Sequence, residues 1–119
     1  CPSNPFLSID PILAVKGVRE KLKKSKARII AVSPIVGGDA VKGPTANNLR
    51  DLGFSVSAYT IAKYYSDFID GFMLDKEDEN EISRIESLGI QVGLADTVMT
   101  DLQSKIKLAE DVLRFSKTL

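Results

Sequence analysis

Three short apolar runs alternate along the chain with longer segments in which apolar residues recur every three or four positions. The runs cover residues 28–33, 71–75 and 90–96, and their β-branched, non-alternating composition is typical of strands buried on both faces of a parallel sheet. The longer segments predict helices at residues 10–26, 45–52, 57–65, 82–88 and 101–117. This alternation predicts an α/β fold, part of a mainly parallel Rossmann-like sheet with flanking helices.

Proline and glycine refine the beginning of this pattern. Pro2 and Pro5 predict an extended or turning loop rather than the start of a helix. Asp10 followed by Pro11 predicts a helix N-cap with proline at the first helical position, and Gly17 predicts an interruption of that helix. No repeat, linker or low-complexity segment divides the sequence, so we treat residues 1–119 as a single unit.

The chain opens on a loop-forming segment, Cys1 to Pro5, without an initiator Met. Loops of this kind usually connect two elements, and we therefore expect the 119 residues to be a fragment of a longer protein. A processed or unusual terminus is the alternative.

Composition excludes several functions. The chain has 16 Lys plus Arg and 16 Asp plus Glu, so it lacks the overall positive field of a nonspecific nucleic-acid binder and no nucleic-acid partner is expected. The absence of His excludes a Ser-His-Asp triad or a His metal site built from this chain alone. A single cysteine, Cys1, excludes an internal disulfide framework. No apolar run approaches the roughly 18 residues of a membrane span, so we expect no membrane partner and a cytoplasmic protein.

Polar and glycine-rich segments follow each predicted strand. In open α/β sheets ligands bind beyond the carboxyl ends of the strands. Gly37, Gly38 and Lys42 in the loop after Ser33 have the parts of an anion cradle, with exposed backbone N–H groups and a cation. The loop does not match GxxxxGK[ST] or GxGxxG, and a plain structural turn is the other interpretation.

Other polar groups leave similar alternatives open. Asp75 and Asp96 end the second and third predicted strands and suit either Mg²⁺ binding or helix capping, with capping favoured for Asp75. The basic stretch 21–26 is typical of a helix C-terminus or of a phosphate contact. The acidic stretch 76–81 suits either helix stabilisation or metal binding. Tyr64 and Tyr65 suit either the core or stacking on a ring.

Several of these segments together resemble the 2-phospho-L-lactate transferase family, whose members build the deazaflavin coenzyme F420. The resemblance rests on segments that occur in the same order: Pro2-Ser3-Asn4-Pro5 with Ser8 to Leu13, Ala31 to Gly38 with Ala40 to Pro44, Asp67 to Phe72, Leu88 to Ile90, and Asp96 to Met99. It implies transfer of a 2-phospho-L-lactyl group, or phosphoenolpyruvyl in some relatives, from a guanosine diphosphate conjugate to the deazaflavin FO, giving F420-0 and GMP. It also implies Mg²⁺ dependence and a homodimer.

Family members are longer, and the chain resembles their C-terminal part. The resemblance together with loop position assigns substrate binding to Ser3, Asn4, Ser33, Gly37, Gly38, Lys42, Asp96 and Thr97. Catalytic residues stay unknown, because the main acidic residue and the metal ligands are expected in the absent N-terminal half, and the fragment alone is expected to be inactive. A non-catalytic, nucleotide-binding regulatory relative and a purely structural domain are the alternative functions.

Overall fold

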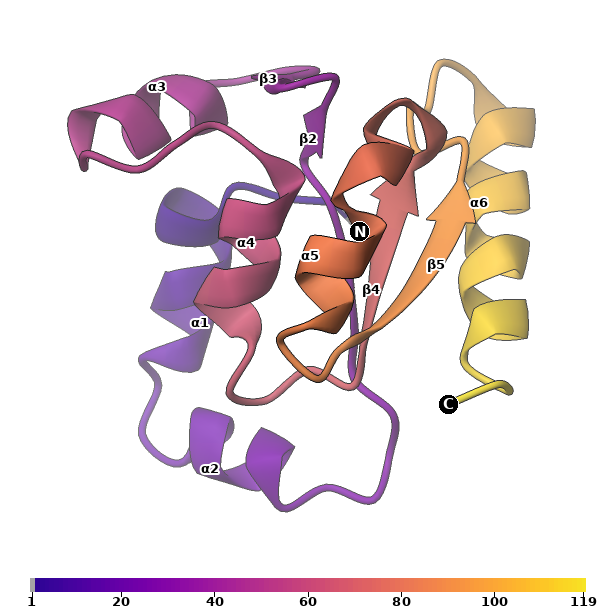
Figure 1. Ribbon diagram of the computed structural model, residues 1–119. Helices are drawn as coiled ribbons and strands as arrows, with labels where there is room; N and C mark the ends of the chain where they lie inside the picture. The colour runs from indigo at the N-terminus through magenta and orange to yellow at the C-terminus, as the bar shows by residue number, and fades with distance from the viewer. Residues whose placement is uncertain (1) are drawn as a thin grey trace.

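The structure is a computed structural model that describes residues 2–119. Its centre is a three-stranded parallel sheet in the order β1-β4-β5, formed by Ile30–Val32, Gly71–Asp75 and Gln91–Ala95. The register aligns Ile30 with Gly71 in the first pair of strands and Gly71 with Gln91 in the second. All three predicted strands are present, and both pairs of neighbouring strands are parallel; Figure 1 shows β4 and β5 side by side. The α/β prediction is therefore confirmed.

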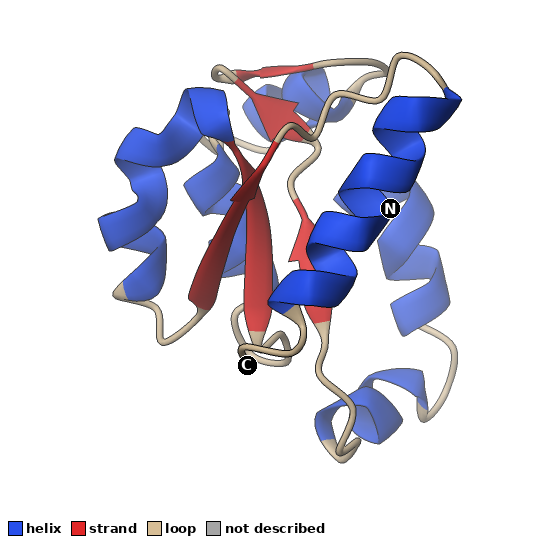
Figure 2. Cartoon of the chain, turned by 90° about the vertical axis from the view of Figure 1, so that its right-hand side faces the viewer, coloured by secondary structure: helices blue, strands red, loops and turns tan. Residues whose placement is uncertain are grey.

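Helices cover both faces of this sheet (Figures 1 and 2). One face carries helices from the first three quarters of the chain, and the other face carries α6. Their bounds are η1 Pro5–Ile9, α1 Asp10–Leu13, α2 Val18–Lys23, α3 Thr45–Asp51, α4 Ala58–Tyr65, η2 Lys76–Glu81, α5 Ile82–Glu86 and α6 Leu102–Phe115. Within residues 2–119, no helix is both long and apolar enough to cross a membrane.

The beginning of the chain is more helical than its prolines suggest. A π-helical turn, η1, begins at Pro5 and continues directly into α1. The Asn4 side chain caps it by accepting hydrogen bonds from the backbone N–H groups of Phe6 and Leu7. Proline at a first helical position lacks only an N–H that would have no helical partner there. The predicted loop is present at residues 2–4, but its extension to Pro5 and the cap at Asp10 were wrong. The break at Gly17 is confirmed, since it separates α1 from α2.

The predicted loop 34–44 contains a small antiparallel hairpin. Its strands are β2, Ile35–Val36, and β3, Asp39–Ala40, with Val36 aligned on Asp39. Gly37 and Gly38 form the two-residue turn, with φ of 59° and 78°. A tight hairpin turn of this kind needs positive φ at both central residues, which glycine adopts without a steric penalty. This pair therefore has a structural role.

Burial differs among the three parallel strands. All five residues of β4 are buried, whereas the three residues of β1 are half-buried and β5 is mixed. The prediction of strands buried on both faces thus holds for the central strand only. In the described chain β1 and β5 are the edges of the sheet, where part of each strand stays open to solvent.

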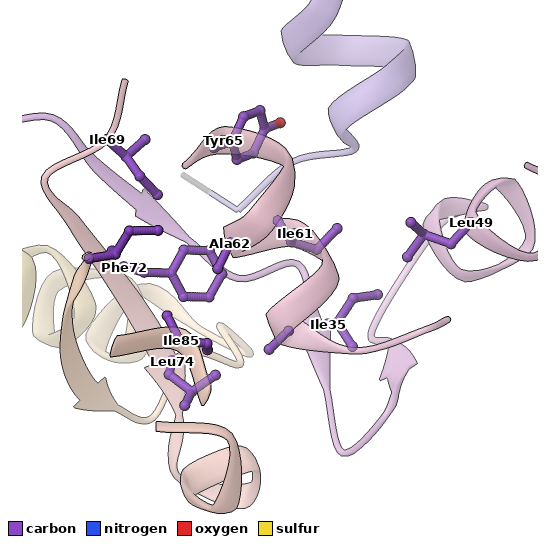
Figure 3. Packing of buried hydrophobic residues seen from close by; sticks show 11 residues of the cluster. Ile35, Leu49, Ile61, Ala62, Tyr65, Ile69, Phe72, Leu74 and Ile85 are labelled. Carbon is purple, nitrogen blue, oxygen red and sulfur yellow. The ribbon is translucent and has the colours of Figure 1, made fainter. Parts of the chain in front are cut away.

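Two apolar clusters hold the layers together. The larger lies between the sheet and the helices α4 and α5, with Ile61, Phe72 and Ile85 at its centre (Figure 3). The smaller lies under α6, where Met73, Ala95 and Leu108 are buried. Burial of such side chains contributes about 1.5–3 kcal/mol each, so the two clusters fix the sheet edge from which the functional loops extend.

Candidate functional site

A pocket of about 310 Å³ lies beyond the carboxyl ends of the sheet. Four separate segments line it: the N-terminal segment, the turn after β1, the start of α3 and the connection from β5 to α6. Its lining residues are Pro2, Ser3, Asn4, Ser33, Pro34, Val36, Val41, Lys42, Gly43, Pro44, Thr45, Thr97, Val98 and Met99. The convergence of these loops at one edge of the sheet agrees with the general position of ligand sites in open α/β sheets.

Five of the eight predicted site residues line this pocket. They are Ser3, Asn4, Ser33, Lys42 and Thr97. Gly37 and Gly38 lie instead in the hairpin turn, and Asp96 lies on the surface beside α6. Substrate binding by all eight stays a prediction. The structure places five of them at the pocket and the other three in a turn or in an ion pair.

Asn4 and Ser33 use their side chains to shape the pocket. Besides capping η1, Asn4 donates its amide to Asn48 Oδ1 at 2.8 Å, which ties the N-terminal segment to α3. The buried Ser33 hydroxyl donates to the carbonyl of Ile35 at 2.7 Å and accepts from the backbone N–H of the same residue at 3.1 Å. It thereby forms the turn that leads from β1 into β2.

The wall formed by Thr97 and its successors is fixed by a buried carboxylate. Asp75 Oδ2 accepts hydrogen bonds from the backbone N–H of Thr97 at 2.7 Å and from its hydroxyl at 2.8 Å. Asp75 Oδ1 accepts from the backbone N–H of Glu77 at 3.1 Å, so Asp75 is also the N-cap of η2. The capping interpretation of Asp75 is confirmed.

Asp96 is held in surface ion pairs. Its carboxylate lies 2.6 Å from Lys107 Nζ and 2.9 Å from Lys76 Nζ. Hydrogen bonds from Lys107 and then Lys76 lower the pKa of Asp96, and the pairing raises the pKa of Lys107. This arrangement fastens α6 to the end of β5.

Asp78 is a buried carboxylate that the sequence did not single out. Its Oδ2 accepts the backbone N–H of Gly37 at 3.0 Å, which joins the hairpin turn to η2. Burial raises the pKa of Asp78, and the negative charge of nearby Asp75 raises it further. Hydrogen bonds from the backbone N–H groups of Gly37 and Gly38 lower this pKa, but by less, so the net shift is upward. These N–H groups face a carboxylate of the protein itself, which argues against an anion cradle at the two glycines.

Ser3 and Lys42 are the polar side chains of the lining that are most available to a ligand. In the described part of the chain, neither makes a side-chain hydrogen bond or an ion pair. Lys42 is exposed at the rim, and no acidic side chain lines the pocket with it. A cation without an acidic neighbour favours a negatively charged ligand.

Sequence reasoning missed the apolar half of the pocket and one buried polar residue. Val36, Val41, Val98 and Met99 supply the apolar surface, and Thr45 is buried where α3 begins. The signal for Thr45 was its place directly after Gly43-Pro44, at the start of a helix. Tyr65, by contrast, belongs to the core, edge-to-face against Tyr64 and Phe68, as one of the two interpretations expected.

Metal binding finds little support among the described residues. Within residues 2–119, no group of three Cys, Asp or Glu side chains is close enough to hold a metal ion. Three carboxylates at or after the ends of β4 and β5 are already engaged, Asp75 and Asp78 with backbone N–H groups and Asp96 with two lysines. These residues therefore do not by themselves fit an Mg²⁺ site.

A parallel sheet with a small, partly apolar pocket at its carboxyl edge defines the chain as part of an α/β protein with a candidate ligand site at that edge. The comparisons with known proteins are more specific. The family model described as 2-phospho-L-lactate transferase CofD matches residues 1–113, and the chain belongs to this family.

Individual relatives agree with the family. The chain is 40% identical over 118 residues to the 2-phospho-L-lactate transferase of Methanosarcina barkeri and 42% identical over 113 residues to that of Methanosarcina mazei. It is also 35% identical over 117 residues to the phosphoenolpyruvate transferase of Kitasatospora aureofaciens. These matches cover 95–99% of the chain but only 36–38% of the relatives, so the chain spans less than two-fifths of their length.

Proposed function

We propose that these residues form part of a transferase that moves a 2-phospho-L-lactyl or phosphoenolpyruvyl group from a guanosine diphosphate conjugate to the hydroxyl of the deazaflavin FO. Both transfers release GMP; the first gives F420-0, and the second gives its unsaturated analogue. Family membership supports the transferase activity, and the relatives' names include both 2-phospho-L-lactate and phosphoenolpyruvate. The single observation that carries the proposal for this site is the pocket at the carboxyl edge, with Lys42 at its rim and no acidic lining residue.

The chemistry of this transfer suits the residues present. Attack of a hydroxyl on a diphosphate depends mainly on alignment and on neutralising charge, and it needs little covalent help from the protein. Lys42 would lie against the diphosphate, and the Ser3 hydroxyl would hydrogen-bond substrate. The apolar side chains of Val98 and Met99 would exclude water from one side. The chain's lack of His is compatible with such a mechanism.

Further parts of the proposal concern the longer protein. Mg²⁺ would be bound by residues outside positions 2–119 and by substrate oxygens, and no step above depends on it. We propose that the protein is a homodimer. We also propose that the 119 residues alone bind substrates weakly and do not turn over, because they span less than two-fifths of the length of their relatives. A cytoplasmic location stays a prediction.

A chimeric enzyme tests the proposed function. The chain would replace the segment that it matches in the Methanosarcina barkeri protein, and the folded chimera would be incubated with the guanosine conjugate, FO and Mg²⁺. We expect release of GMP and formation of F420-0, with the unmodified relative as the positive control and the 119-residue chain as the inactive control. A folded chimera that binds GDP but releases no GMP would favour a non-catalytic nucleotide-binding protein instead.

A further inference from the structure

A buried hydroxyl at the start of α3 opens into the pocket. Thr45 is only 3% exposed, and it lines the pocket beyond the carboxyl ends of the sheet. Within residues 2–119 its hydroxyl makes no hydrogen bond, and the one side-chain oxygen that is both unpartnered and fully enclosed belongs to Tyr65. The oxygen of Thr45 therefore keeps an opening, and the open space beside this residue is the pocket.

The other buried hydroxyls of the pocket wall are satisfied by the protein itself. Ser33 donates to the carbonyl of Ile35 and accepts its backbone N–H, and Thr97 donates to Asp75. A buried polar group without a hydrogen bond is costly, so water or a ligand has to supply the partner of the Thr45 hydroxyl. The hydroxyls of Ser33 and Thr97 hold the fold, whereas that of Thr45 is left for a molecule in the pocket.

The first turn of α3 holds this hydroxyl in a fixed position. Leu49 is 1% exposed and anchors the helix in the larger apolar cluster. Asn48, which lies on the same side of the helix as Thr45, accepts a hydrogen bond from the side chain of Asn4 at 2.8 Å. This bond ties α3 to the N-terminal segment across the pocket wall. A ligand therefore meets a group that is already ordered, and little conformational entropy is lost on binding.

The charge near Thr45 indicates which kind of ligand atom its hydroxyl meets. Lys42 lies three residues earlier and lines the same pocket, and the part of the lining that the structure describes contains no carboxylate. A hydroxyl that donates to an anionic oxygen forms a hydrogen bond about twice as strong as one to a neutral acceptor. A phosphate oxygen suits both groups, because it accepts from the hydroxyl while the ammonium group of Lys42 neutralises its charge.

We propose that the hydroxyl of Thr45 donates a hydrogen bond to a phosphate oxygen of the ligand, in the same phosphate group that Lys42 neutralises. The identity of that ligand as a guanosine diphosphate conjugate rests on the proposed function. Thr45 would then be a binding residue that adds a buried neutral donor to an exposed cation. The test measures the binding of phosphate compounds and needs no group transfer.

Calorimetric titration of GDP into the folded chimeric enzyme tests this hydrogen bond. Thr45→Val removes the hydroxyl and keeps a side chain of similar shape, and we expect the Kd for GDP to rise about tenfold or more. Thr45→Ser keeps the hydroxyl and should recover most of the affinity that valine loses. Thr100→Val is the matched control, because Thr100 is exposed and lies outside the pocket lining. Equal affinity of the parent and Thr45→Val chimeras would overturn the proposal.

Two fragments of the nucleotide identify the atom that the hydroxyl contacts. Pyrophosphate carries the phosphates without the nucleoside, and guanosine carries the nucleoside without the phosphates. We expect Thr45→Val to weaken the binding of pyrophosphate and to leave the binding of guanosine unchanged. A loss confined to guanosine would overturn the assignment to phosphate, and so would a chimera that binds neither GDP nor pyrophosphate.

The outcomes for the transfer reaction are separate. A chimera that shows the expected loss of GDP affinity in Thr45→Val but releases no GMP supports the phosphate contact and contradicts only the proposed transferase. A chimera that releases GMP while Thr45→Val keeps the parent affinity contradicts only the phosphate contact.

Thermal unfolding of the chimeras distinguishes a ligand contact from a contact with another part of the longer protein. If a ligand completes the hydroxyl, Thr45→Val should not lower the unfolding midpoint of the ligand-free chimera, but it should reduce the rise in midpoint that GDP produces. A lower midpoint without ligand, or a Thr45→Val chimera that does not fold, would show that the protein itself accepts this hydrogen bond and would overturn the proposal.

Discussion

Asp75 holds Thr97 through two hydrogen bonds to a single carboxylate oxygen, at 2.7 and 2.8 Å. Both residues are buried; Asp75 ends β4, and Thr97 lies two residues beyond the end of the adjacent strand β5. Thr97, Val98 and Met99 then form one wall of the pocket. The carboxylate thus positions a wall of the candidate site from behind, without lining the site itself.

Replacing Asp75 by Asn should destabilise the fold and loosen this wall. An amide at this position presents only one acceptor oxygen, so at least one of the three N–H or O–H donors around Asp75 loses its partner. Leaving a buried donor unsatisfied costs about 1–3 kcal/mol. Denaturant unfolding would measure the loss.

Asp51→Asn is the matched control for this substitution. Asp51 is exposed at the end of α3, and the same change there should alter the free energy of unfolding by less than about 0.5 kcal/mol. Equal stability of the two variants would contradict a structural role of the Asp75 carboxylate.

The packing of Phe115 on the sheet requires a residue without a side chain at Gly71. A Cβ added at Gly71 would lie 2.8 Å from the ring of Phe115 and 2.9 Å from Cδ1 of Leu119, both closer than ordinary van der Waals contact. Gly71→Ala should therefore displace α6 and destabilise the chain by about 1–3 kcal/mol, the usual range for overpacking. Thermal or denaturant unfolding would measure this change.

A double-mutant cycle tests the cause of that loss. Phe115→Leu removes the ring and should cost stability on its own, but in its presence Gly71→Ala should cost less, with Leu119 as the remaining close contact. Strict additivity of the two substitutions would show that the ring is not the obstacle, because independent sites add and contacting sites do not.

The ring of Phe115 also explains why a glycine, Gly93, occurs inside the predicted strand β5. Gly93 weakens the pattern of β5, yet a Cβ there would lie 3.0 Å from Phe115, so glycine makes room for α6. The apolar composition of the strands follows from burial against neighbouring layers, and local sequence records it. The packing of Phe115 against Gly93 is a tertiary contact between distant parts of the sequence. No local sequence pattern predicts it.

The candidate site was predictable to a similar extent. Its position followed from the rule that loops at the carboxyl ends of parallel strands meet, and that rule brought Ser3 and Lys42 into one pocket. Gly37 and Gly38 suited both an anion cradle and a turn, because positive φ serves either purpose. The hydrogen bond from Gly37 to Asp78, 41 residues away, favours the turn, and a contact of such range is invisible in the sequence.

Asp78 is expected to make stability depend on pH in a direction opposite to that of a typical surface carboxylate. Burial raises the pKa of Asp78 above its ordinary value of 3.8, so the unfolded chain releases this proton first as the pH rises. The free energy of unfolding therefore falls between pH 3.8 and the raised pKa of the folded state. Asp78→Asn removes this contribution, and its stability relative to the parent chain should increase across that window and then become constant.

Asp96→Asn provides a comparison of opposite sign. Lys107 and Lys76 lower the pKa of Asp96, so its contribution to stability is present above pH 3.8 and is lost as the pH falls through the lowered value. Relative to the parent chain, Asp96→Asn should lose stability as the pH rises to 3.8. Unfolding curves at a series of pH values would measure both variants, and the same slope in the two would contradict the opposite environments of the carboxylates.

Lys42→Ala tests the electrostatic role of the pocket rim. If this ammonium group contacts the diphosphate of the substrate, its removal should cost about 1.5–3 kcal/mol of binding, or roughly ten- to 150-fold in the Kd for GDP. Calorimetric titration of GDP into the chimeric enzyme would measure the change, with Lys63→Ala as the matched control because Lys63 is exposed on α4, outside the pocket. The loss should also shrink as salt is added, since a rim charge is screened by ions. Unchanged affinity in Lys42→Ala would exclude Lys42 from the nucleotide site and would leave Ser3 and backbone groups as the polar contacts of the pocket.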